Sequence, residues 1–182
     1  NWLEEMLQLC QQKDVGMAGA KLYYPDDTIQ HAGVVVGLGG VAAHVLCKLP
    51  RDAEGYMGRL RCVQEISAVT AACMMVKTSV FKAVGGFDEE LKVAFNDIDL
   101  CMKVRKYGVK IVFTPYAELY HYESKSRGLE DTPEKVARFN KEIATFEKKW
   151  PEILENGDPY YNPNLTLNNT DCSLRKQEKN GD

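Results

Sequence analysis

The chain has 182 residues, 45% of them hydrophobic, and its 23 basic and 26 acidic side chains give a formal net charge of −3. This composition is typical of a globular domain and lacks the basic excess that a nucleic-acid-binding surface requires. The longest stretch without a polar residue, 32–43, is shorter than the roughly 20 apolar residues of a membrane-spanning helix. We therefore expect neither a nucleic-acid partner nor a transmembrane segment.

The first half of the chain predicts one helix followed by strands. Apolar residues recur at helical spacing over 2–10, which predicts a helix at the start of the chain. Residues 15–24 and 29–36 are rich in strand-forming side chains, and the turn residues 25–27 between them predict a hairpin. The long apolar run 63–76 suits a buried central strand.

The second half predicts helices that alternate with strands, followed by a polar tail. The expected elements are a short helix capped by Thr78 and ending at Val84, a helix capped by Asn96 and closed by Gly108, strands over 109–114 and 117–122 separated by Pro115, and a helix from Thr132-Pro133 to Lys149. Beyond Pro151 the composition turns polar and loses its periodicity. We therefore expect one domain over 1–165 and a polar, disordered tail over 166–182.

The cysteines are scattered along the chain, and no Cys-x-x-Cys pair spells a zinc or thioredoxin-like motif. A chain long enough to bury a sizeable core does not depend on disulfides, so reduced thiols and a cytoplasmic location are favoured.

Two aspartates in the first turn of the helix at 96 are the strongest candidates for chemistry. Asp97 shares its helix face with the apolar Leu100 and Val104, so it is expected to point toward the protein or a cleft. Asp99 lies with Lys103 and is expected to face water. Asp97 is therefore the better candidate for a general base. The alternative is structural, since acidic residues in a first turn favour the helix dipole by roughly 0.3–1 kcal/mol without any function.

Polar residues at the end of the second predicted strand pair suggest anion or metal binding. His121 leaves the strand before a Gly/Ser loop, and its imidazole suits a divalent ion, although a lone histidine is more often structural. Ser126 and Arg127 in that loop could hold a phosphate, the alternative being a solvated loop. His31 and His44 are expected to be structural or solvent-facing and to stay outside the site.

Three motifs taken together resemble the family 2 glycosyltransferases of the GT-A fold: Gly85–Glu89 (GGFDE), Phe95–Cys101 (FNDIDLC) and Tyr120–Gly128 (YHYESKSRG). The likeness is strongest to bacterial rhamnosyl and O-antigen transferases, and it covers about residues 1–165. It implies an α/β fold that corresponds to the C-terminal part of a nucleotide-diphospho-sugar transferase, a mixed sheet flanked by helices.

The resemblance also implies roles for individual residues. Asp97 would be the catalytic base of an inverting transfer, and His121 would help to hold a divalent metal, Mn²⁺ or Mg²⁺. Ser126 and Arg127 would contact the donor diphosphate. Thr70 and Asn96 would lie on the acceptor side. The implied partners are a nucleotide-diphosphate sugar and an acceptor glycan, which could be membrane-associated, so the inner face of the plasma membrane is an alternative to a purely cytoplasmic location.

The chain departs from the family pattern because it lacks the first half, with its metal-chelating Asp-x-Asp. We therefore expect the acceptor-side half of an enzyme that is inactive alone and self-associates through exposed apolar surface. Two other functions stay open at this point: a non-catalytic module that binds a glycan or a partner chain, and a metal-dependent phosphoesterase using Asp97, Asp99 and His121.

Overall fold

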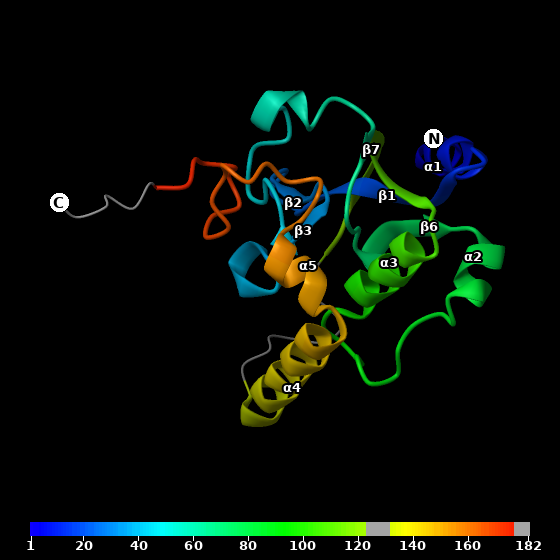
Figure 1. Cartoon of the computed structure of the whole chain (residues 1–182). Helices are drawn as coiled ribbons and strands as arrows, with labels where there is room; N and C mark the ends of the chain where they lie inside the picture. Colours follow the sequence, from blue (N-terminus) through cyan, green and yellow to red (C-terminus); the bar gives the residue numbers. More distant parts are fainter. Residues whose placement is uncertain (123–131, 177–182) are drawn as a thin grey trace.

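The computed structural model describes residues 1–122 and 132–176, which form a mixed β-sheet with helices on both faces (Figure 1). The helices are α1 (Trp2–Cys10), α2 (Thr78–Ala83), α3 (Asn96–Lys106), α4 (Pro133–Lys149) and α5 (Pro151–Asn156), with short 3₁₀ turns η1 (Leu38–Gly40), η2 (Tyr56–Gly58) and η3 (Ala71–Cys73). The strands are β1 (Val15–Tyr23), β2 (Ile29–His31), β3 (Val34–Val36), β4 (Ala42–His44), β5 (Gln64–Glu65), β6 (Met74–Val76) and β7 (Lys110–Tyr120). The mixed α/β architecture agrees with the predicted GT-A class.

β1 is the central strand of the main sheet. It pairs in parallel with β7 on one side and antiparallel with β2 and β6 on the other, and β5 extends the sheet beyond β7. The predicted hairpin is confirmed, because Leu22 of β1 lies opposite His31 of β2. β3 and β4 form a separate two-stranded sheet.

The two faces of the main sheet are covered by different elements. Side chains alternate along β1, so Ala18 and Leu22 face α1 and join its buried residues Met6 and Leu9 in a small apolar core. Met17 faces the opposite side, where a larger core includes the apolar residues of α3. The helix that carries both candidate aspartates is thus anchored on the larger core.

β7 is one strand, whereas the sequence predicted two strands separated by Pro115. The register with β1 jumps between Thr114, which lies opposite Ala20, and Glu118, which lies opposite Lys21. Proline has no N–H to donate to a neighbouring strand, and Pro115 lies in the stretch where the pairing with β1 is interrupted. β7 therefore continues past the proline instead of ending there.

The prediction of one buried strand over 63–76 was wrong. The run is divided into β5, η3 and β6, because the Thr70 hydroxyl caps a 3₁₀ turn in the middle of it. The predicted strand 29–36 is divided as well. Gly33 separates β2 from β3 with a φ of 103°, a conformation that glycine adopts readily.

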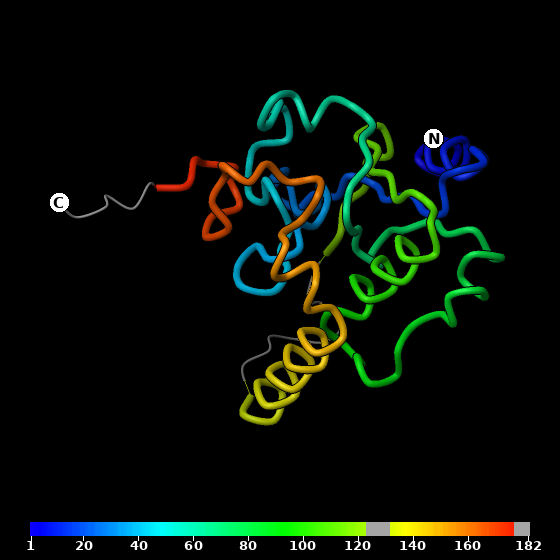
Figure 2. Tube along the Cα trace, in the orientation of Figure 1, coloured from blue at the N-terminus to red at the C-terminus, as the bar shows by residue number. Residues whose placement is uncertain are grey.

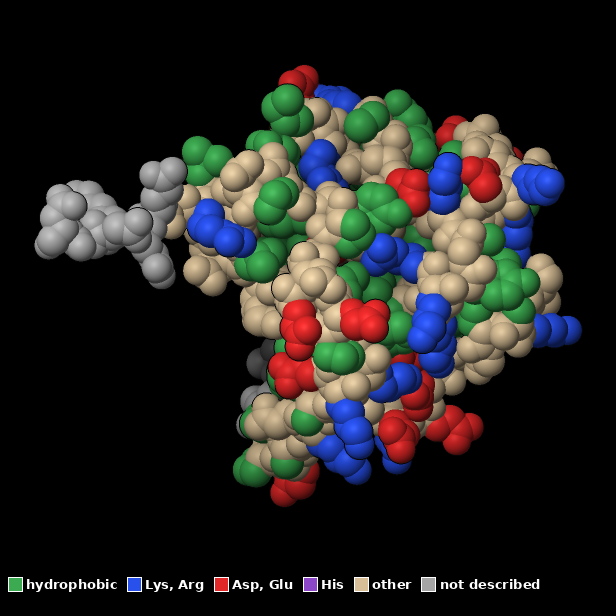
Figure 3. Space-filling model, viewed as in Figure 1, with side chains coloured by type: hydrophobic (Ala, Val, Ile, Leu, Met, Phe, Trp, Pro, Cys, Tyr) green, Lys and Arg blue, Asp and Glu red, His purple; other side chains and the backbone are tan. Residues whose placement is uncertain are grey.

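The predicted helices are present, with corrected starts for two of them. The N-cap positions are Lys77 for α2 and Phe95 for α3, so Thr78 and Asn96 are the first helical residues rather than caps. The cap predicted for α4 is confirmed, since the Thr132 hydroxyl accepts a hydrogen bond from the N–H of Lys135. α4 extends from the body of the molecule (Figure 1), and acidic and basic side chains intermingle over α4 and α5 (Figure 3).

The segment after α5 packs back onto the domain, as Figure 2 shows, although its composition predicts disorder from residue 166. The N–H of Thr166 bonds to the carbonyl of Ser173 at 2.9 Å, and Thr170 accepts a bond from the N–H of Leu46 at 2.6 Å. The turn chemistry of this polar segment therefore orders it through residue 176. The cysteines are all free thiols, as expected.

In the described ranges, no helix combines the length and apolar character needed to cross a membrane.

Candidate active site

Asp97 lies in the first turn of α3, where two backbone N–H groups hold its carboxylate. Oδ1 accepts a hydrogen bond from Ile98 at 2.9 Å, and Oδ2 accepts one from Ala71 at 3.0 Å. The residue is half-buried, and a carboxylate has lone pairs left for a further donor. Asp97 thus has the position that the helix-face argument predicted, packed against the protein yet partly accessible.

Thr70 builds the turn that meets Asp97. Its hydroxyl accepts a hydrogen bond from Ala72 at 3.3 Å, and its own N–H donates to Nε2 of His31 at 3.4 Å. Asn96, the other predicted acceptor-side residue, is the half-buried first residue of α3. The structure therefore places both acceptor-side candidates beside Asp97, one through the turn and one through the helix.

Val69 fastens the same turn to the sheet and to α3. It packs on β1 at Gly19, where an added Cβ atom would lie 2.3 Å from a Val69 methyl carbon. Its N–H also contacts Sγ of Cys101 at 3.5 Å. Cys101 follows Asp97 by one helical turn, so two neighbouring side chains of α3 bind the same short segment. These contacts tie the turn to α3 one helical turn beyond Asp97.

His31 and His44 form a pair next to this turn. Their Nδ1 atoms lie 2.9 Å apart, with the rings edge to face. Because the Thr70 N–H donates to Nε2 of His31, neutral His31 carries its proton on Nδ1 and donates it to His44. Burial holds the pKa of His31 well below its ordinary value, and the imidazoles of His44 and His121 add to this effect. His31 is therefore a neutral support of the Thr70 turn, a link that sequence reasoning missed.

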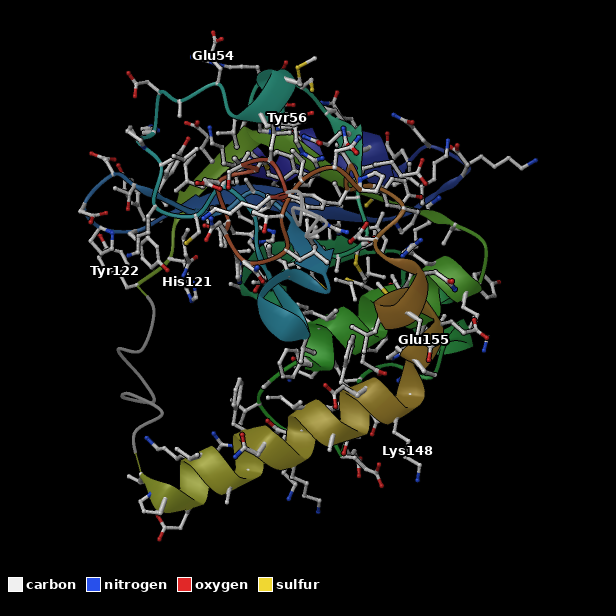
Figure 4. All side chains as sticks on the ribbon, turned by 60° about the vertical axis from the view of Figure 1, so that its left-hand side comes forward. Glu54, Tyr56, His121, Tyr122, Lys148 and Glu155 are labelled. Carbon is white, nitrogen blue, oxygen red and sulfur yellow. The ribbon has the colours of Figure 1, made fainter. Side chains whose placement is uncertain are left out.

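His121 follows the last residue of β7 and is oriented by Gln30. The backbone N–H of His121 donates to the carbonyl of Tyr23 at 2.9 Å. Its ring Nδ1 lies 2.7 Å from the Gln30 amide nitrogen and 3.0 Å from the Gln30 amide oxygen. Because Gln30 occupies Nδ1, the Nε2 atom of the His121 ring is the one that can reach a ligand. Figure 4 shows His121 and Tyr122 where β7 leaves the sheet, at the margin of the molecule.

Gln30 was not among the sequence-based candidates, but the sequence contained a signal for it. Gln30 and His31 interrupt the otherwise apolar stretch 29–36, and both are buried. Buried polar side chains require partners. Gln30 contacts His121 at the end of β7. His31 accepts a hydrogen bond from the N–H of Thr70.

The prediction that Asp99 faces water was wrong. Its side chain is completely buried, with Oδ1 2.6 Å from Nζ of Lys149 and Oδ2 2.9 Å from Nζ of Lys103. Trp150 Nε1 also donates to Oδ1 at 2.9 Å. Burial lowers the pKa of Lys149, but its hydrogen bonds to Asp88 and Asp99 outweigh burial and raise the pKa above its ordinary value. Asp99 is thus engaged by the α4–α5 junction, which covers the side of α3 that the sequence pattern assigned to solvent.

Ser126 and Arg127, the predicted diphosphate-binding residues, lie outside the described residues. Within 1–122 and 132–176, no group of three or more His, Cys, Asp and Glu side chains is placed to hold a metal ion. His121 is therefore a candidate for a single ligand and not for a complete metal centre.

Comparison with known proteins supports the predicted resemblance. The sequence model of a family described as "Glycosyltransferase like family 2" matches residues 1–139. The chain is 56% identical over 175 residues to the uncharacterized protein y4gI of Sinorhizobium fredii, and 38% identical over 183 residues to the O-antigen biosynthesis protein RfbC of Myxococcus xanthus. These alignments cover 96% and 100% of this chain, but only 19% and 14% of the two relatives.

A shorter match links the chain to the N-acetylglucosaminyl-diphospho-decaprenol L-rhamnosyltransferase of Mycobacterium tuberculosis, with 37% identity over 60 residues, or 33% of this chain and 20% of that protein. The family match covers most of the chain, including the Thr70 turn and the start of α3, whose N–H groups bind Asp97. The chain therefore belongs to the glycosyltransferase-like family 2.

Proposed function

We propose that this chain forms the acceptor-side part of an inverting glycosyltransferase, which moves a sugar from a nucleotide-diphosphate donor to a hydroxyl of an acceptor glycan. Family membership supports the reaction class. Relatives named for O-antigen biosynthesis and for L-rhamnosyl transfer support a cell-surface glycan as the product. The observation that carries the proposal is the half-buried Asp97 carboxylate, held by two backbone N–H groups at the start of α3.

In this reaction the acceptor hydroxyl attacks the anomeric carbon while the bond from that carbon to the diphosphate breaks. Asp97 takes the proton of the hydroxyl as the new C–O bond forms. A positioned base of this kind typically contributes about 10²–10⁴ in rate. Its two backbone hydrogen bonds hold the carboxylate in one orientation before the substrate arrives, which favours proton transfer in a fixed geometry.

A divalent ion, Mn²⁺ or Mg²⁺, is part of the proposal, with His121 as one ligand and Ser126 and Arg127 as contacts of the diphosphate. The imidazole fits this role because Gln30 orients it through Nδ1. When bound, the ion would stabilise the negative charge of the leaving diphosphate.

The role of His121 is tested by replacing it with alanine in the full-length protein. We expect His121→Ala to raise the metal concentration needed for half-maximal activity, measured by titration with Mn²⁺ and Mg²⁺. Tyr107→Phe, an exposed aromatic position after α3, is the control. Identical titration curves for His121→Ala and the control would show that the imidazole is structural.

The reaction class is tested by incubating the full-length protein with a panel of nucleotide sugars, including an L-rhamnose donor, and with an acceptor glycan. We expect nucleoside diphosphate release that depends on the acceptor. Glycan binding without release would instead identify a non-catalytic module. A phosphoesterase that uses Asp99 as a metal ligand is disfavoured, because Lys103 and Lys149 already engage both carboxylate oxygens.

We also propose that the isolated chain has negligible turnover, since its described residues provide a single candidate metal ligand. A cytoplasmic location, or one at the inner face of the plasma membrane, is the setting expected for a nucleotide-sugar donor. Self-association is supported by Trp2, Leu3 and Leu7, which are exposed on α1. Concentration-independent sedimentation of the chain would argue against it.

A further inference from the structure

Glu142 of α4 accepts hydrogen bonds from three consecutive backbone N–H groups. Its Oε1 lies 3.0 Å from the nitrogen of Lys92 and 3.1 Å from that of Val93, and its Oε2 lies 2.9 Å from that of Ala94. The Glu142 residue is only 2% exposed. Successive N–H groups that converge on an anion form a strong, charge-assisted binding arrangement. Here the anion is a side chain that arrives from a helix more than forty residues later in the sequence.

The residue after this segment has an unusual conformation. Phe95 adopts a left-handed backbone with φ 61° and ψ 4°, which is rare for a bulky side chain. Its ring packs against Phe139 and Phe146, with centroids 5.7 and 5.5 Å away. Both rings lie on α4 on either side of Glu142, at spacings that place the three on one helix face. One face of α4 therefore holds the whole segment 92–95.

The sharp turn at Phe95 sets the direction in which α3 begins. Asn96 is the first helical residue, and Asp97 follows it with its carboxylate against the N–H of Ala71. A change in the path of 92–95 would rotate or shift this first turn. Asp97 would then move relative to the turn at Thr70, because nothing lies between Phe95 and Asp97 to absorb the change except Asn96.

We propose that Glu142 is a positioning residue, which holds segment 92–95 and thereby orients Asp97 toward the acceptor hydroxyl. This inference rests on the proposed function of Asp97 as the base. It goes beyond the family assignment, because the family match ends at residue 139 and Glu142 lies after it. The orientation of the base would thus depend on a side chain supplied from outside the matched region.

The alternative is that Glu142 only fastens α4 to the body. The two roles predict different effects on the hydrogen bonds of Asp97, which lies away from Glu142 in the sequence. A mere fastening role affects stability but leaves the amides that contact Asp97 unchanged. A positioning role changes the hydrogen bonds that Ala71 and Ile98 donate to Asp97, and it lowers kcat more than it raises KM for the acceptor.

The first test records amide resonances of the chain by NMR for wild type, Glu142→Leu, Glu142→Gln and Glu147→Gln. Glu147 is exposed on the same helix and serves as the matched control. We expect the Ala71 and Ile98 amide signals to shift in Glu142→Leu, to shift less in Glu142→Gln, which keeps one oxygen acceptor, and to stay in place in Glu147→Gln. Should Glu142→Leu fail to fold, the comparison between the two glutamine variants decides. Unmoved Ala71 and Ile98 signals in a folded Glu142 variant would overturn the proposal.

The second test measures kcat and KM in the full-length protein. We expect Glu142→Leu to lower kcat about tenfold or more with little change in the acceptor KM, since small misplacements of catalytic groups are costly. Glu142→Gln should recover part of the rate. A fall in kcat no larger than the fall in the fraction of folded protein, with no recovery of rate by glutamine, would contradict the positioning role. If the amides shift but Asp97→Asn retains full activity, the coupling stands and the assignment of Asp97 as base fails.

Discussion

Asp97 and Asp99 occupy the same helical turn, yet the regions on the two sides of α3 treat them differently. On one side, Asp97 meets backbone N–H groups and remains partly accessible. On the other side, Asp99 is completely buried between two lysines and an indole N–H. Side chains of identical chemistry thus become a candidate reactive group and a structural anchor, because different elements pack against each side of one helix.

The largest expected effect is on turnover, and it separates the two aspartates most clearly. In the full-length protein, Asp97→Asn should lower kcat by about 10²–10⁴, because an amide cannot accept the hydroxyl proton. Its unfolding free energy should fall by about 1–2 kcal/mol, because the amide oxygen can accept only one of the two backbone N–H bonds and the other N–H then faces an NH₂ group. Donor binding, measured by calorimetry, should be nearly unaffected.

Glu147→Gln, an exposed carboxylate change on α4, is the control and should leave kcat unchanged. A near-normal transfer rate in Asp97→Asn would remove the distinction between the two sides of α3, because neither aspartate would then act in the reaction.

The second effect concerns stability on the Asp99 side. Lys149→Met should cost about 3 kcal/mol, because it leaves the completely buried Asp99 carboxylate with one lysine instead of two. Urea unfolding of the chain measures this change. Lys148→Met, which alters the exposed neighbouring lysine, should stay within about 0.5 kcal/mol of wild type. Similar losses for the two variants would mean that the buried cluster adds little to stability.

The smallest effect is a pH dependence on the Asp97 side. The folded-state pKa of His31 lies below its ordinary value, so the unfolded chain binds a proton first as pH falls. The contribution of His31 to stability is therefore fully present above about pH 6.5 and declines below it, by about 1.4 kcal/mol per pH unit.

His31→Gln removes the titrating ring but keeps an oxygen that can accept the Thr70 N–H bond. We expect the pH dependence of its unfolding free energy between pH 6.5 and 5 to be shallower than that of wild type. Parallel curves would show that the acid sensitivity arises from groups other than His31, and that the Thr70 turn does not depend on a neutral imidazole.

Much of the fold was predictable where local pattern and local structure agree. β1 and α4 were predicted within a residue or two, because a continuous apolar strand and a Thr-Pro helix start are strong local signals. The run 63–76 failed for the opposite reason. Its apolar composition suits a strand, but the Thr70 hydroxyl bonds its own backbone and creates the turn that meets Asp97.

The candidate site was partly predictable in the same sense. The position of Asp97 followed from helix periodicity, whereas Gln30 and His31 became relevant only through contacts with residues that lie far away along the chain. Helix periodicity identifies a face but not what covers it. That limit explains the error at Asp99.

The residues by themselves determined which segments are helices, which helix carries the two aspartates, and which family the motifs resemble. Only the tertiary structure decided that the α4–α5 junction buries Asp99, that His31 supports the turn at Thr70, and that Glu142 binds the backbone just before α3. Hydrogen bonds between neighbours follow from sequence spacing. Hydrogen bonds and ion pairs between distant elements depend on how the sheet and helices pack, and all three of these features rest on such contacts.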